Sequence, residues 1–188
     1  MWWPEKSACF PRLLRLAVAM AAAGMTAGCF QPLYGDHSLT GGPGILDKMG
    51  SVEVLPVDAP AGTPVARIGV ETRNQLIYEL TGGGGTNSPT HRLKMSLNAN
   101  RLQVIVDLTS ARPDLENYGI DANYTLVEIA SGKTVFEGRA VARVSYDIPG
   151  SQQRFARARG LRDAENKASK VIAEAIKQRL ASYFVAGG

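Results

Sequence analysis

Residues 120–146 read IDANYTLVEIASGKTVFEGRAVARVSY, and this stretch decides the fold. Apolar and polar side chains alternate on both sides of the segment ASGK at 130–133, which has the composition of a tight turn. Alternation with a period of two is typical of strands that bury one face. The stretch therefore predicts an antiparallel hairpin with one face on a core and the other toward water or a partner.

The run before this hairpin changes its phase of alternation. Apolar residues fall on odd positions from Leu93 to Ala99 and on even positions from Leu102 to Leu108. A shift of one residue moves every side chain to the other face of a strand. The run therefore predicts either one bent strand with a bulge between Asn98 and Arg101, or two short strands.

Two amphipathic helices flank this meander. The pair Thr63-Pro64 is a helix start, and apolar residues follow at steps of three or four until the glycines at 82–85. A second, longer helix is expected over about 153–184, and the apolar segment at 52–57 predicts one further short strand. The order β-α-β-β-β-α predicts an α+β two-layer sandwich, a mixed sheet of about four strands with two helices on one face.

Composition and charge favour one compact domain. The chain has 188 residues, of which 45% are apolar and 20% charged, and its formal net charge is +4. Residues 29–188 carry 18 positive and 16 negative groups, a net of +2, so bulk charge gives little support to nucleic-acid binding. We expect a single domain over 51–188, preceded by a Gly- and Pro-rich flexible tether at 29–50.

The N-terminus has the pattern of a secretory signal peptide at 1–28. Basic residues precede an apolar run at 16–25, which is too short to cross a bilayer, and small residues follow. The segment Thr26-Ala-Gly-Cys29 resembles a bacterial lipobox, which predicts diacylglycerol and an N-acyl chain on Cys29. The alternative is a plain signal peptide. Phe30 follows Cys29 where inner-membrane lipoproteins often carry Asp, which favours the outer membrane.

The sequence offers little catalytic chemistry. Its two histidines, His37 and His91, have no second ligand at metal spacing, and no serine lies in a nucleophile-elbow motif. We therefore expect no enzyme, no metal and no cofactor apart from the acyl chains.

A basic segment lies at the start of the last helix. Residues 154–162 hold Arg154, Arg157, Arg159 and Arg162 and no acid. Positive side chains oppose the dipole at a helix start, so the cluster is either a solvated face or a site for phosphate or carboxylate. Two residues in strand connections join the candidate site if their loops lie at the same end of the sheet; they are Arg112 and Lys133.

Several segments together resemble the lipopolysaccharide-assembly lipoprotein family LptE, in its alphaproteobacterial form. They are CFQPLYG at 29–35, TPVARIGVETRNQLIYEL at 63–80, the meander, and RDAENKASKVIAEAIKQRLASYF at 162–184. The resemblance implies an outer-membrane lipoprotein that plugs the LptD β-barrel, assists its assembly and binds lipopolysaccharide. Arg112 and Arg157 are the nearest counterparts of the family's ligand-contacting basic residues, with Arg154 and Arg159 as neighbours.

A role as a plug would explain why the sheet face that does not pack on the core is polar, because a barrel lumen is also polar. The charged residues expected on that face are Lys94, Arg101, Asp107, Glu137, Arg139 and Arg143. The same face also suits exposure to solvent. The alternative function is that of a lipoprotein subunit of another envelope secretion or transport complex.

Overall fold

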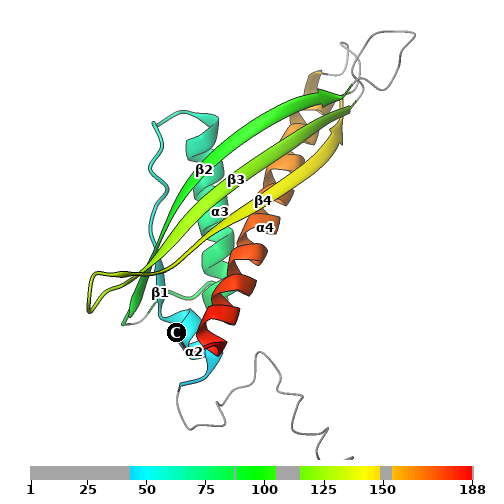
Figure 1. The fold of residues 1–188 in the computed structure, drawn as a ribbon. Helices are drawn as coiled ribbons and strands as arrows, with labels where there is room; N and C mark the ends of the chain where they lie inside the picture. Colours follow the sequence, from blue (N-terminus) through cyan, green and yellow to red (C-terminus); the bar gives the residue numbers. More distant parts are fainter. Residues whose placement is uncertain (1–42, 87, 105–114, 149–153, 188) are drawn as a thin grey trace, which may run out of the picture. The chain divides into compact units, whose positions relative to one another are not determined.

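Four strands form one mixed sheet in the computed structural model, which describes residues 43–86, 88–104, 115–148 and 154–187 (Figure 1). The strands are β1 (Val52–Val54), β2 (His91–Val104), β3 (Leu115–Glu128) and β4 (Thr134–Asp147), and they lie in the order β1-β2-β3-β4. The strand β1 is parallel to β2, whereas the β2–β3 and β3–β4 pairs are antiparallel.

Two long helices cover one face of this sheet. They are α3 (Pro64–Thr81), which connects the parallel strands β1 and β2, and α4 (Arg154–Val185), which contacts β3 and β4 (Figure 1). The core lies between the layers and includes Leu93, Ile120, Leu126, Ile172 and Leu180. The predicted α+β sandwich is confirmed.

The start and end of α3 follow from local chemistry. The Thr63 hydroxyl accepts a hydrogen bond from the backbone N–H of Ala66 at 3.2 Å, and Pro64 occupies the first turn. The helix ends at Gly82, whose φ of 70° is a left-handed conformation that glycine adopts at low cost. Both features match the sequence-based expectation.

The helices α3 and α4 run parallel and in register. Arg67 of α3 pairs with Glu165 of α4, and Glu79 of α3 pairs with Lys177 of α4 at 2.9 Å. Each pair is separated by 98 residues in the chain. A constant separation means that the two helices advance together along the sheet.

The strand β2 is continuous, so the run that begins at Leu93 is one strand as far as Val104 and not two short strands. Its pairing with β3 runs without interruption from His91 to Val104, so the expected bulge between Asn98 and Arg101 is absent. Leu102 therefore lies on the outer face and is 66% exposed. The even-position apolar pattern from Leu102 onward does not mark the buried face.

A short helix, α2 (Ile45–Gly50), lies within the expected tether. Its Met49 is fully buried in the core, and its Lys48 ammonium lies 5.9 Å from the centre of the Phe184 ring of α4. The packed part of the chain therefore begins before Ser51. Burial of the Met49 side chain stabilises the fold by more than the entropy lost when the neighbouring glycines become ordered. The rest of the tether and the signal peptide lie outside the described residues.

His91, at the start of β2, should make stability depend on pH. Burial lowers the pKa of His91 below 6.5; Glu128 opposes this shift and Lys48 adds to it. The unfolded chain then takes up the proton more readily, so the free energy of unfolding falls as the pH drops below about 6.5. Urea unfolding measures the free energy of unfolding at about pH 7.5 and about pH 5.0. The loss of this free energy between the two pH values should be larger for the native protein than for His91→Gln. Equal differences would contradict the prediction.

Candidate functional site: the basic end of α4

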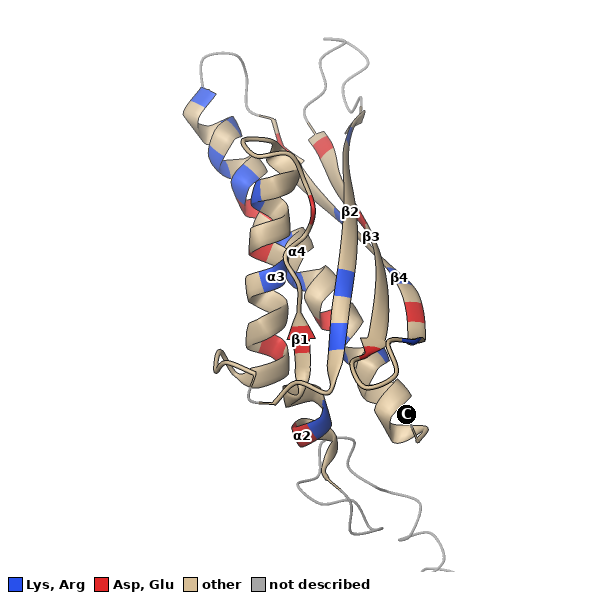
Figure 2. Ribbon diagram, turned by 90° about the vertical axis from the view of Figure 1, so that its left-hand side faces the viewer, with Lys and Arg blue, Asp and Glu red and all other residues tan. Residues whose placement is uncertain are grey.

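The four predicted arginines occupy the first turns of α4. Figure 2 shows basic residues gathered at this end of the helix, beyond the start of α3. All four are exposed, and the first acidic residue of the helix is Asp163. No acidic side chain in the helix's own first turns therefore balances their charge.

The helical period divides these arginines between two sides. Arg157 lies seven residues before Ala164, which is buried, so Arg157 is on the side that faces the sheet. Arg159 and Arg162 lie on the opposite side together with Phe155, which is 88% exposed. These three residues line a shallow hollow of about 510 Å³ on the helix surface.

Arg157 is drawn toward the sheet by a buried carboxylate. Its Nη2 lies 3.7 Å from Oε2 of Glu116, whose side chain is 5% exposed on the inner face of β3. The Tyr146 hydroxyl of β4 donates a hydrogen bond to the same carboxylate oxygen. Burial, together with this contact to Glu116, raises the pKa of Tyr146 to about 12, so the phenol keeps its proton. Arg157 therefore serves to dock the start of α4.

The other three arginines lack such a carboxylate partner among the described residues; they are Arg154, Arg159 and Arg162. Within the part of the chain that the structure describes, none of them forms an ion pair with a carboxylate. Their guanidinium groups are therefore available to an anion, and a guanidinium can hold phosphate or carboxylate with two parallel hydrogen bonds.

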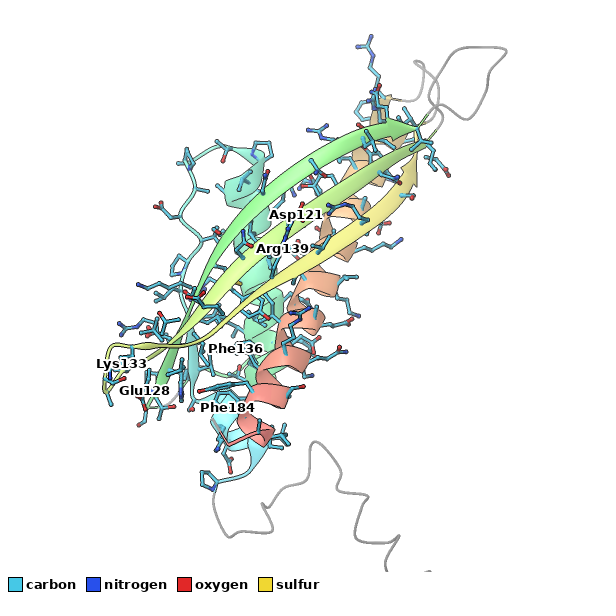
Figure 3. All side chains as sticks on the ribbon, in the orientation of Figure 1. Asp121, Glu128, Lys133, Phe136, Arg139 and Phe184 are labelled. Carbon is cyan, nitrogen blue, oxygen red and sulfur yellow. The ribbon has the colours of Figure 1, made fainter. Side chains whose placement is uncertain are left out.

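Of the two further predicted site residues, the structure places only Lys133, and it does not join this cluster. Lys133 lies in the β3–β4 turn, at the opposite end of the sheet from the start of α4 (Figure 3). This corrects the expectation, because successive connections of an antiparallel meander leave opposite ends of the sheet. Arg112 falls in 105–114 and Cys29 in 1–42, so both lie outside the described residues.

Four of the six charged residues predicted for the outer face of the sheet lie on it. Asp121 accepts hydrogen bonds from Arg139 at 2.8 Å and from Arg143 at 3.1 Å, and these contacts lower its pKa (Figure 3). Lys94 and Glu137 lie on the same face. Arg101 does not, because it is opposite Tyr118 in the β2–β3 register and therefore points to the helix side. Asp107 lies outside the described residues.

The sequence analysis did not single out Glu116 and Glu165, the two buried carboxylates in the described part of the chain. The alternation in β3 could have found Glu116, because it continues the even-numbered inner face of Tyr118, Ile120 and Ala122. For Glu165 the signal is its position on the buried stripe of α4, one residue after Ala164.

Residues 43–86, 88–104, 115–148 and 154–187 hold no group of three His, Cys, Asp or Glu side chains that could bind a metal ion. None of the helices in these ranges combines the length and apolar character needed to cross a membrane.

Comparison with solved structures identifies the fold. A protein described as a lipoprotein from Caulobacter crescentus CB15 matches with a TM-score of 0.61 at 19% identity, over 77% of this chain and 97% of that one. Rare lipoprotein B from Shewanella oneidensis matches with a TM-score of 0.50 at 13% identity, over 72% and 96%. No protein-family model and no curated protein matches the chain. The chain thus has a fold that is shared with bacterial lipoproteins.

Removing Arg157 should cost more stability than removing Arg159. The substitution Arg157→Ala leaves the buried Glu116 carboxylate with Tyr146 as its remaining partner, which should lower the free energy of unfolding by about 1 kcal/mol. The matched substitution Arg159→Ala also removes one positive charge, but this charge has no buried partner among the described residues. It should change the free energy of unfolding by less than about 0.5 kcal/mol. Urea unfolding of both variants measures the difference. Equal losses would show that Glu116 does not dock the helix.

Proposed function

We propose that this protein is an outer-membrane lipoprotein of the LptE type, anchored by acyl chains on Cys29. In this role it plugs an LptD-type β-barrel, supports the assembly of that barrel and binds lipopolysaccharide on its way to the outer leaflet. The role is one of binding and not of catalysis. Two features support it jointly: the fold shared with bacterial lipoproteins and the order of sequence segments that resembles the LptE family.

The observation that carries the proposal is the outward side of α4 at its start. Arg159 and Arg162 lie beside the exposed Phe155 ring, with no acid between 154 and 162. A phosphorylated glycolipid offers both an anion for the guanidinium groups and an apolar part for the ring. Exposing an aromatic ring to water is unfavourable, so Phe155, beside arginines that have no carboxylate partner among the described residues, suits contact with such an amphiphile.

The dimensions of the domain agree with a plug that stands upright in a barrel. The 32 residues of α4 span about 48 Å, whereas a bilayer with its headgroups is about 40–45 Å thick. The basic end of α4 lies at one end of this length, and α2 lies at the other (Figure 1).

The outer face of the sheet suits the lumen of a barrel. It presents Lys94, Glu137 and the Asp121–Arg139–Arg143 network, all of which can pair with a polar, wet wall. A large apolar face would not fit there.

Purification of the full-length acylated protein from its native outer membrane in mild detergent tests the function. We expect mass spectrometry to find a large β-barrel at about one-to-one stoichiometry, together with lipopolysaccharide. Recovery of the protein alone, or with components of a different envelope secretion or transport complex, would overturn the proposal.

Lipopolysaccharide binding should depend on the outward arginines. The variant Arg159→Gln/Arg162→Gln should weaken binding by about tenfold or more at low salt, and the effect should shrink as salt rises. The matched variant Lys167→Gln/Lys170→Gln removes positive charge farther along the same helix and should bind nearly as the native protein does. Titration of the full-length protein with purified lipopolysaccharide measures both, and equal binding by all three proteins would contradict the prediction.

A further inference from the structure

A second hollow lies on the helix side of the sheet, away from Phe155. It has a volume of about 560 Å³ and lies between the start of α3, the side of α4 and the far part of β2. It exists because α3 starts late: Pro64 is level with residue 162, about two turns into α4. The inner face of β2 near Arg101 therefore has no α3 above it.

Arg101 contributes one positive group to this hollow. Its place opposite Tyr118 in the β2–β3 register directs the side chain to the helix side, and it lines the hollow. Among the described residues no carboxylate pairs with it.

Arg67 contributes a second positive group, which is held in a fixed position. Its Nη2 donates a hydrogen bond to Glu165, a carboxylate whose side chain is 4% exposed, and the Arg67 side chain itself is partly exposed. Within the described structure its other guanidinium nitrogens have no hydrogen-bond partner. Glu165 therefore orients Arg67 and leaves donors for a ligand.

The charges and the walls of the hollow define the ligand class. Two guanidinium groups face a single carboxylate, so the hollow keeps a net positive charge. Val70, which is 60% exposed, and Leu161 add an apolar wall beside the charged groups. An anion that carries a short apolar group would satisfy both.

We propose that this hollow is a binding site for an organic anion, a phosphate monoester or carboxylate, which Arg67 and Arg101 hold against the apolar wall of Val70 and Leu161. The site is separate from the outward side of α4. It does not depend on the proposed function, because neither the barrel nor lipopolysaccharide enters its geometry.

Titration of the full-length acylated protein in neutral detergent micelles with butyl phosphate tests the proposal. Ionic strength is held constant with sodium chloride, and NMR follows the side-chain Nε–H signals of Arg67 and Arg101. We expect saturable shifts of both signals and at least threefold weaker binding of inorganic phosphate. Shifts that do not saturate, or equal affinity for both anions, would overturn the proposal.

Three variants decide where the anion binds. The substitution Arg101→Gln, at an exposed residue, should weaken butyl phosphate binding at least fivefold and leave the fold intact. The matched control Arg92→Gln lies on the same strand but on the outer face, paired with Glu53 at 2.8 Å, and should bind normally. The variant Arg159→Gln/Arg162→Gln should also bind normally. Unchanged binding by Arg101→Gln, or its loss in the Arg159→Gln/Arg162→Gln variant, would refute the site.

Discussion

The need to cover one face of a long sheet governs the rest of this structure. The strands β2, β3 and β4 have 14 residues each, which corresponds to a length of about 46 Å. The 32-residue α4 spans about 48 Å and covers this length, whereas the 18-residue α3 spans about 27 Å and covers only part of it. The sheet therefore has one end with two helices above it and another end with α4 alone.

The chemistry of the inner face changes along this length. Beneath both helices it is apolar, with Leu93, Ile120 and Leu126 fully buried. Toward the far end it becomes polar, with Arg101 and Glu116 on the same face. The buried Glu116 carboxylate docks α4 through Arg157, and the uncovered part beside α3 forms the second hollow. The second hollow thus arises where α3 no longer covers the sheet.

Sequence patterns predicted the layers because each depends on local periodicity. The alternation from Ile120 to Tyr146, the Thr63 cap and the long last helix all reflect the spacing of side chains in a single element. The missed features depend on contacts between distant elements. Leu102 is exposed because continuous pairing with β3 outweighs its apolar side chain, and Met49 is buried because α2 packs on α3 and α4. Likewise, the four arginines look equivalent in sequence, but in the structure only Arg157 lies beside the buried Glu116 carboxylate.

Site-specific photo-crosslinking in the native outer membrane tests the plug role most directly. A photoreactive amino acid at Val141, on the outer face of β4, and at Val171, on the exposed side of α4, samples two opposite sides of the domain. A plug is surrounded by one wall, so both positions should crosslink to the same large β-barrel. Crosslinks from only one position, or to different proteins from the two positions, would contradict this role.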